Sequence, residues 1–263
     1  MVNVKLLFWN LKNNPINEIL SKILIERDVD VAILAEYKGI SFDKVVELTD
    51  ENYTLCEGVG GCDKITLVCK NEISVTIRRE HSRYVLYDFE KDGIQYNLIG
   101  LHLPDQLNST CDDRKFVIRE AVRDIKELEL DNKNYKTIVL GDLNCNPFDG
   151  EIVQKDSFNA VLFRSLIEKT DKVTYNGEQF RRFYNPVLLC LSETDRTYGS
   201  IYYSSGIAPL YWNSFDQVLI RKELVDAFES MEYVKTIGTT NLIKEVAPNK
   251  EISDHLPLIV SLH

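Results

Sequence analysis

The sequence lacks several features that would assign it to a simple class. No apolar run approaches the ~20 residues that a membrane-spanning helix needs. The six cysteines are scattered without a CxxC pair, so neither a zinc knuckle nor a redox motif is indicated. No repeat, low-complexity segment or linker divides the chain. These absences favour a single domain over residues 1–263, with reduced thiols that partly serve as small core residues.

Basic residues are outnumbered by acidic ones, 31 Lys and Arg against 41 Asp and Glu. The formal net charge is −10 and no stripe is rich in Lys or Arg, so long-range attraction of a polyanion is disfavoured. The opening MVNVKLLFWN has one Lys and no cleavable apolar segment. We therefore expect a cytoplasmic protein, and we expect it to be a monomer. Part of the negative charge would be functional if several carboxylates converge on a cation.

The first third of the sequence predicts a βαβ-like unit. Apolar residues predict strands over 2–9 and 31–35, and helical spacing between them predicts a helix with Pro15 at its first position. Asn10 follows the first strand and Glu36 follows the second. Since parallel strands end at one edge of a sheet, we expect Asn10 and Glu36 to lie at the same edge.

The rest of the chain alternates between strands and helices. An Asp at 112 or 113 is expected to cap a long helix. A second helix is expected over 157–169. Strands are predicted over 64–69, 83–89, 94–103, 215–220 and 258–262.

The stretch KTIVLGDLNCNP, residues 136–147, carries the first candidate site residues. Its apolar run predicts a buried strand that stops at Gly141. Asp142 and Asn144 follow at a spacing of two, so their side chains would point the same way at the end of the strand. A carboxylate and an amide in that position suit a site that holds a water or hydroxyl against a phosphate.

Six short blocks, in this order, resemble the endonuclease/exonuclease/phosphatase superfamily: FWN, LAEY, GLHLPD, GDLN, SFDQVLI and SDHLPL. The resemblance runs from about residue 3 to residue 262. It implies a four-layered α/β/β/α sandwich of two mixed sheets with outer helices and an active site at one edge. It also implies Mg²⁺-dependent hydrolysis of a phosphate ester.

Magnesium prefers oxygen ligands and carboxylates, and three residues are candidates for holding it. Glu36 is the best candidate, and the resemblance places Asn10 beside it. Asp254 would bind the metal directly or through water. Mn²⁺ is a possible substitute for Mg²⁺.

The catalytic candidates lie in the later blocks. His255 is expected to act as a base or as a partner of the transition state, with Asp216 fixing its tautomer. By resemblance, Asp142 and Asn144 orient the attacking water and a phosphate oxygen. His102 would donate to a non-bridging oxygen or protonate the leaving oxygen.

The substrate is less constrained than the chemistry. Residues 170–213 are rich in aromatics and contain Arg181 and Arg182, which we expect to bind substrate phosphates. An ordinary aromatic core beneath a long loop would explain the aromatics equally well. The first hypothesis is a nuclease that cuts DNA or RNA. The alternatives are a phosphatase or phosphodiesterase acting on a small or lipid-linked phosphate ester, and a non-enzymatic binding module with the same fold.

Overall fold

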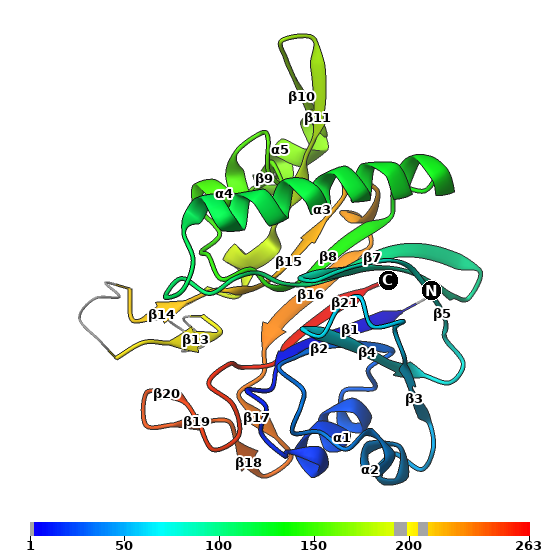
Figure 1. Cartoon of the computed structure of the whole chain (residues 1–263), viewed down its shortest axis with the longest axis vertical. Helices are drawn as coiled ribbons and strands as arrows, with labels where there is room; N and C mark the ends of the chain where they lie inside the picture. Colours follow the sequence, from blue (N-terminus) through cyan, green and yellow to red (C-terminus); the bar gives the residue numbers. More distant parts are fainter. Residues whose placement is uncertain (1–2, 192–198, 205–209) are drawn as a thin grey trace.

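The computed structural model describes residues 3–191, 199–204 and 210–263. Two large β-sheets lie face to face, and helices cover their outer faces (Figure 1). The first sheet has six strands in the order β16 (Phe228–Tyr233), β21 (Leu258–Leu262), β1 (Val4–Asn10), β2 (Val31–Ala35), β4 (Ile65–Lys70) and β3 (Tyr53–Cys56). The second has seven, in the order β5 (Ser74–His81), β6 (Tyr84–Lys91), β7 (Ile94–His102), β8 (Thr137–Asp142), β15 (Asp216–Ile220), β12 (Phe183–Tyr184) and β9 (Ala160–Val161).

The helices complete the four layers. The outer face of the first sheet carries α1 (Asn17–Glu26) and α2 (Phe42–Leu48). The outer face of the second carries α3 (Cys111–Asn132), α4 (Gly150–Val153) and α5 (Arg164–Lys169). The expected α/β/β/α sandwich with outer helices is confirmed.

Both sheets are mixed, as expected. Strands β1 and β2 are parallel, as are β7 and β8, whereas β21, β4 and β15 run antiparallel to their neighbours in these sheets. Because β1 and β2 run the same way, their last residues reach one edge of the first sheet, and β7 and β8 do the same in the second.

The core follows from the alternation of side chains along β8. Ile138 and Leu140 belong to the apolar cluster that fills the space between the sheets. Val139 belongs to the second cluster, with Ile118 and Ile125 of α3. A strand buried on both faces reads as a continuous apolar run, which is how the sequence shows it.

Helix α1 begins later than Pro15. The side-chain amide of Asn14 donates to the carbonyls of Lys250 at 3.3 Å and Ile252 at 3.0 Å, so it ties two distant segments together. The helix starts at Asn17. The expectation of a start at Pro15 is wrong by two residues.

Two other helix boundaries also differ from expectation. Helix α3 is capped by Thr110, whose hydroxyl accepts from the Asp113 backbone N–H while the Asp113 carboxylate accepts from the Thr110 N–H. The helix expected over 157–169 is confined to α5, because residues 160–161 pair with β12 instead. Tertiary pairing thus overrides the local helical pattern.

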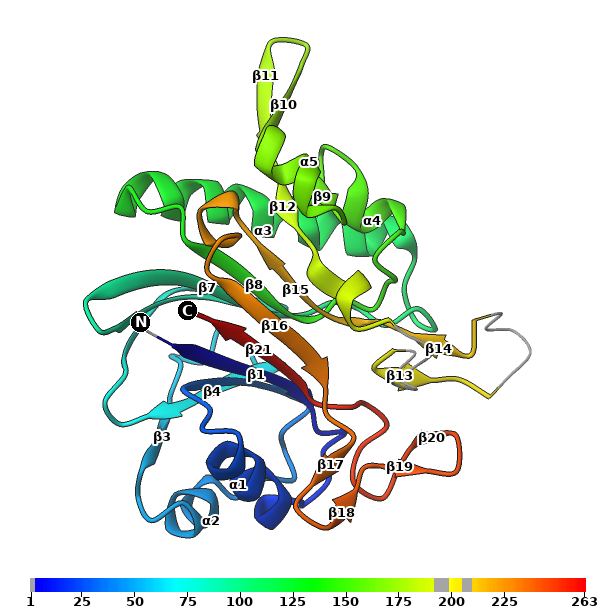
Figure 2. The same cartoon turned by 180° about the vertical axis from the view of Figure 1, so that it is seen from behind.

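Several short strands and turns lie outside the two large sheets. The hairpin of β10 (Lys172–Tyr175) and β11 (Glu178–Arg181) projects beyond α5, and β13 (Ile201–Tyr202) pairs with β14 (Trp212–Asn213) at one side of the sandwich (Figure 2). The remaining pieces are the two-residue strands β17 (Thr236–Ile237), β18 (Thr240–Asn241), β19 (Ile243–Lys244) and β20 (Ala247–Pro248), and the 3₁₀ turns Pro186–Leu189 and Lys222–Leu224. Within the described ranges, no helix is both long and apolar enough to cross a membrane.

Candidate active site

The second sheet lines up three candidate residues. His102 ends β7 and lies opposite Asp142 at the end of β8. Asp142 in turn lies opposite Asp216 at the start of the antiparallel β15. All three side chains are buried or nearly so. The register of the sheet therefore forms a row of one histidine and two carboxylates at a single edge.

The first sheet adds Asn10 and Glu36 to this row. Asn10 pairs with Ala35 at the end of β1, so Glu36 follows directly beside it. The Asn10 Nδ2 lies 3.0 Å from Glu36 Oε1 and 3.3 Å from Asp142 Oδ2. One amide thus donates to a carboxylate of each sheet. The expected proximity of Asn10 and Glu36 is present.

His255 lies in a short turn just before β21, and this turn packs against the end of β1. The Ser253 hydroxyl donates to the Asn10 carbonyl at 2.6 Å and accepts from the His255 backbone N–H at 3.1 Å. The Trp9 indole N–H donates to the His255 carbonyl at 3.0 Å. These contacts fix the backbone of His255 against β1, so the position of its ring is set by the sheet rather than by a free loop.

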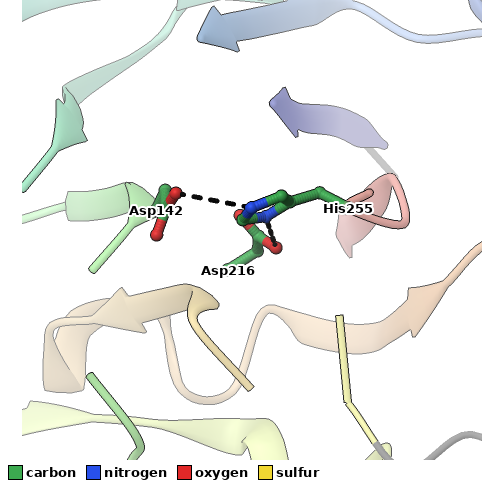
Figure 3. Close-up of side chains that lie close together, drawn as sticks. All are labelled: Asp142, Asp216 and His255. Carbon is green, nitrogen blue, oxygen red and sulfur yellow. Dashed lines mark hydrogen bonds and ion pairs between the residues drawn. The ribbon is translucent and has the colours of Figure 1, made fainter. Parts of the chain in front are cut away.

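His255 and Asp216 form a hydrogen-bonded pair (Figure 3). The His255 Nδ1 lies 2.8 Å from Asp216 Oδ2, and His255 Nε2 lies 3.9 Å from Asp142 Oδ2. One ring nitrogen is therefore held by a carboxylate while the other faces the row of carboxylates. This is the arrangement of an orienting carboxylate and a working imidazole.

Burial and charge act in opposite directions on this pair. Burial raises the pKa of Asp216, whereas the neighbouring His255 lowers it, and burial prevails. Burial also opposes a charge on His255, but the carboxylates around it, with Asp216 first, raise the pKa of His255 to about 10. The imidazolium is therefore the favoured form of His255 at neutral pH in the metal-free protein.

His102 faces the two carboxylates that share the Asn10 amide. Its Nε2 lies 3.8 Å from Glu36 Oε1 and 3.6 Å from Asp142 Oδ2. The other ring nitrogen, Nδ1, is buried and has no hydrogen-bond partner among the described residues. His102 can therefore present an N–H to a ligand bound between Glu36 and Asp142.

Asn144 supports Asp142 through its backbone. The Asn144 N–H donates to Asp142 Oδ1 at 2.9 Å, and its side-chain Nδ2 donates to the Leu103 carbonyl at 2.9 Å. Asn144 and Glu36 both have a φ of 47°, a left-handed conformation that is uncommon for residues other than glycine. The same conformation occurs at residues outside this row, such as Asp50 and Lys133, so it does not by itself mark a site.

The donor set fits a hard divalent cation. Within the described part of the chain, Glu36 and Asp142 have only histidines as ion-pair partners and no Lys or Arg. Glu36 Oε1 and Asp142 Oδ2 both lie near the Asn10 side-chain nitrogen and His102 Nε2. Carboxylate oxygens that converge without a compensating cation are the ligands that Mg²⁺ and Mn²⁺ prefer.

A second group could also hold a metal. Ligand atoms of Asp142, Asp216 and His255 lie within 4.8 Å of one another. Two of these residues, His255 and Asp216, already share a 2.8 Å hydrogen bond through Nδ1 and Oδ2. Glu36 with Asp142 is therefore the better place for a cation.

Asp254 lies at the rim rather than inside the row. Its carboxylate pairs with the Lys12 ammonium at 3.2 Å, and about 30% of its side chain is exposed. Its candidacy as a ligand stays a prediction.

The structure does not bring Arg181 and Arg182 to this edge. Arg181 pairs with Glu223 at 2.5 Å and Asp171 at 3.3 Å, beyond the last residue of β15, whereas Asp216 begins that strand. Arg182 donates to the Thr170 carbonyl at 3.1 Å. The pair expected to bind substrate phosphates therefore lies away from the candidate site, because the β10–β11 hairpin extends from the opposite end of the second sheet.

Tyr203 is a neighbour of the site that the sequence did not single out. Burial raises the pKa of Tyr203 to about 12, and the carboxylates of Asp142, Asp254 and Asp216 add to the effect. Its ring lies 6.0 Å from that of Phe215. The sequence places Tyr203 in a segment crowded with tyrosines, and no local signal distinguishes it from the others.

The comparisons with known proteins bear on the fold. No protein-family model matches the sequence, and no curated protein matches it. Solved structures do. D. rerio TDP2 complexed with single-strand DNA product has a TM-score of 0.60 at 14% identity, covering 99% of both chains. The endonuclease domain of the retrotransposon TRAS1 has a TM-score of 0.56 at 11% identity, covering 99% of this chain and 98% of that domain.

A third structure carries the family name itself. The endonuclease/exonuclease/phosphatase protein of Bacteroides vulgatus has a TM-score of 0.61 at 10% identity, covering all of this chain and 99% of its own. These matches span both sheets and the edge where the candidate residues meet. The chain therefore has the fold of the endonuclease/exonuclease/phosphatase superfamily, as the resemblance in its sequence implied.

Proposed function

We propose that this protein hydrolyses phosphate esters with the help of Mg²⁺ or Mn²⁺, and that its substrate is a phosphodiester in DNA or RNA. The observation that carries the proposal is the His255–Asp216 pair, whose free Nε2 faces the Asp142 carboxylate at 3.9 Å. A phosphodiester needs its charge neutralised, a positioned water and a stabilised leaving oxygen. The residues at this edge suit each of these needs.

Glu36 would hold the metal ion, with Asn10 fixing the orientation of its carboxylate and Asp254 contributing through water. A bound Mg²⁺ or Mn²⁺ supplies Lewis-acid neutralisation of phosphate oxygens. Its absence would leave Glu36 and Asp142 facing an anionic substrate without a countercharge, which opposes binding.

The chain's own residues would handle the water and the protons. Asp142 would orient the attacking water, and the Asn144 backbone contact would keep Asp142 in place. His102 would donate its Nε2–H to a non-bridging or leaving oxygen. His255, held by Asp216, would act on the phosphate as a base or as a cationic partner of the transition state.

The substrate class has support from the matched structures. One of them holds a single-strand DNA product and another is an endonuclease domain, which favours a nucleic-acid substrate here. A monomeric, cytoplasmic, single-domain enzyme stays a prediction from the sequence.

A second candidate is a phosphatase or phosphodiesterase acting on a small phosphate ester. Two observations favour it: the net charge of −10, and the placement of Arg181 and Arg182 away from the active-site edge. A long polyanion normally meets a basic surface, whereas a small ester needs only the site itself.

A substrate panel separates the two candidates. The panel contains single-stranded DNA, duplex DNA, RNA, mononucleotides and inositol phosphates, each with Mg²⁺, with Mn²⁺ and with excess chelator. We expect cleavage of at least one polynucleotide, abolished by chelator and by His255→Ala. Turnover of small esters alone would establish the second candidate. No turnover of any ester, by a protein with an intact fold, would refute both.

A further inference from the structure

A cavity of about 270 Å³ opens beside the active-site edge, between the two sheets. Tyr37, which follows the candidate metal ligand Glu36, forms one of its walls. The cavity also includes Ile65, which pairs with Ala35 at the end of β2, and so it lies at the same edge of the first sheet. We call it the Tyr87 pocket; its central lining residues are Tyr37, Phe42, Leu55, Thr66, Val85 and Tyr87.

The walls of the Tyr87 pocket are mostly aromatic and aliphatic. The rings of Tyr37 and Phe42 lie 6.0 Å apart and are inclined by 54°. Leu55 and Val85 add aliphatic surface from one strand of each sheet. Faces of this kind suit a flat, uncharged ring, which gains from stacking and from leaving water.

A tyrosine hydroxyl is among the polar groups of the pocket lining. Tyr87 is only 2% exposed, and its hydroxyl has no hydrogen-bond partner among the described residues. Cys56, Cys62, Glu80 and Tyr37 all raise the pKa of Tyr87 after burial itself, which places the phenol oxygen among groups that line the same cavity. A phenol hydroxyl can both donate and accept a hydrogen bond. The pocket thus offers a donor and acceptor that nothing in the described chain uses.

The rim is shaped by a glycine-rich loop. One Glu80 carboxylate oxygen accepts from the backbone N–H groups of Val59 at 3.2 Å and Gly61 at 3.0 Å. A methyl group at Gly61 would lie 2.6 Å from the Glu80 Cβ, so the loop can pack this closely only with glycine there. The contact holds the loop over one side of the pocket.

The charge of the rim excludes one class of ligand. The lining residues include Glu57 and Glu80 but no Lys or Arg. An anion such as a phosphate would be repelled by these carboxylates. A neutral ring with hydrogen-bonding atoms on its edge is compatible with them, because the carboxylates can accept from exocyclic amino groups.

We propose that the Tyr87 pocket binds a nucleobase of the substrate next to the phosphate that is cut. The proposal rests on the proposed function for its link to catalysis, because the base and the reacting phosphate would belong to one molecule. The Tyr87 hydroxyl would bond to an edge atom of the base, and the Tyr37 and Phe42 rings, which contact each other, would form one wall against it. The size of the cavity fits one base rather than a stacked pair.

Cysteine alkylation tests binding without turnover. Cys56 and Cys62 line the pocket, whereas the exposed Cys111 begins α3 and serves as an internal control. The full chain is treated with iodoacetamide at about pH 8.5, since burial raises the pKa of both pocket thiols. Alkylation of each cysteine is followed by mass spectrometry with adenosine, guanosine, cytidine, uridine or ribose present.

We expect at least one nucleoside to slow alkylation of Cys56 and Cys62 about threefold or more while Cys111 is unaffected. Ribose, which lacks the base, should have no effect. Equal rates with and without every nucleoside would overturn the proposal. So would protection by ribose alone, since the sugar and not the base would then occupy the pocket.

A conservative variant links the effect to the hydroxyl. Tyr87→Phe keeps the ring and removes only the oxygen, so the fold should persist. The loss of one hydrogen bond should weaken nucleoside protection about threefold to tenfold. Tyr96→Phe is the matched control: Tyr96 is another buried tyrosine, near the start of β7 at the end remote from His102. Equal effects of the two variants would contradict the role of Tyr87.

Turnover gives the second readout. With an oligonucleotide that is cut, Tyr87→Phe should raise KM with little change in kcat, and the change should vanish when the base beside the cut phosphate is replaced by an abasic site. An equal rise with the abasic substrate would overturn the assignment. Nucleoside protection by a protein that cuts no phosphate ester would refute the proposed function and leave the base site standing.

Discussion

Asn10 and Asp142 join the two sheets at the active-site edge. The Asn10 Nδ2, at the end of β1, lies 3.3 Å from Asp142 Oδ2, at the end of β8, and the same nitrogen lies 3.0 Å from Glu36 Oε1. The first sheet supplies the Glu36 carboxylate and the second supplies that of Asp142, and the Asn10 amide donates to both. The proposed cation site therefore depends on how the sheets pack and on no single segment.

Glu36→Gln tests the metal assignment. The change keeps the shape of the side chain but removes the charge that attracts a hard cation, so Mg²⁺ affinity and turnover should both fall sharply. Activity is measured against Mg²⁺ concentration, with Glu47→Gln, at an exposed residue of α2, as the control. Full activity of Glu36→Gln at low Mg²⁺ would contradict the assignment, as would activity of the parent in excess chelator.

Asp216→Asn tests the orienting role of the buried carboxylate. The variant should fold and lose about two or more orders of magnitude in kcat, because an imidazole in the wrong tautomer is poorly placed for catalysis. His255→Ala should be at least as damaging. The double variant should be little worse than the worse single one, since the two residues act as a unit. Multiplicative losses in kcat would show that they act separately.

Replacing Arg181 and Arg182 by Ala should leave catalysis unchanged. Arg181 is paired with Glu223 and Asp171, and Arg182 with a backbone carbonyl, all at the end of the sheet remote from Asp216. KM, kcat and the salt dependence of polynucleotide binding should match the parent. The free energy of unfolding should fall by about 1 kcal/mol or less for each half-exposed ion pair lost. A rise in KM for the double variant would show that Arg181 and Arg182 contribute to substrate binding after all.

The His255–Asp216 pair predicts a pH dependence of stability. The pKa of His255 rises from 6.5 to about 10 in the folded protein. Its stabilising contribution is fully present below pH 6.5 and is lost as the pH rises toward 10. The raised pKa of Asp216 acts with the same sign at lower pH.

Urea unfolding in chelator, from pH 6.5 to 10, measures this dependence. The free energy of unfolding of the parent should fall faster with pH than that of His255→Gln, which cannot bind the proton. Parallel curves for the two proteins would show that His255 is neutral in the folded state at these pH values.

Much of the framework follows from local sequence. The continuous apolar run of β8 predicts a strand buried on both faces, and its end at Gly141 predicts where Asp142 emerges. The same holds for β1 with Asn10 and for β2 with Glu36. These strands are recognisable because burial on both faces leaves few polar residues in the run, with Lys5 the exception in β1.

Other elements could not be predicted from local pattern. Residues 160–161 pair with β12 although their sequence suits a helix. The start of α1 at Asn17 rather than at Pro15 is a second case, since the preceding Asn14 side chain donates to the carbonyls of Lys250 and Ile252 instead. Strand β5 is largely exposed and alternates weakly, and it forms because β6 pairs with it.

The sequence by itself determined which side chains end the central strands, because apolar runs and turn residues are local signals. Only the tertiary structure decided which of those side chains meet. Asp216 and His255 are 39 positions apart, and Asn10 and Asp142 are 132 apart, so their contacts depend on sheet order and register. Sheet order and register also decide that Arg181 lies away from the candidate site. They decide which residues line the Tyr87 pocket as well, because both depend on which strand ends share an edge.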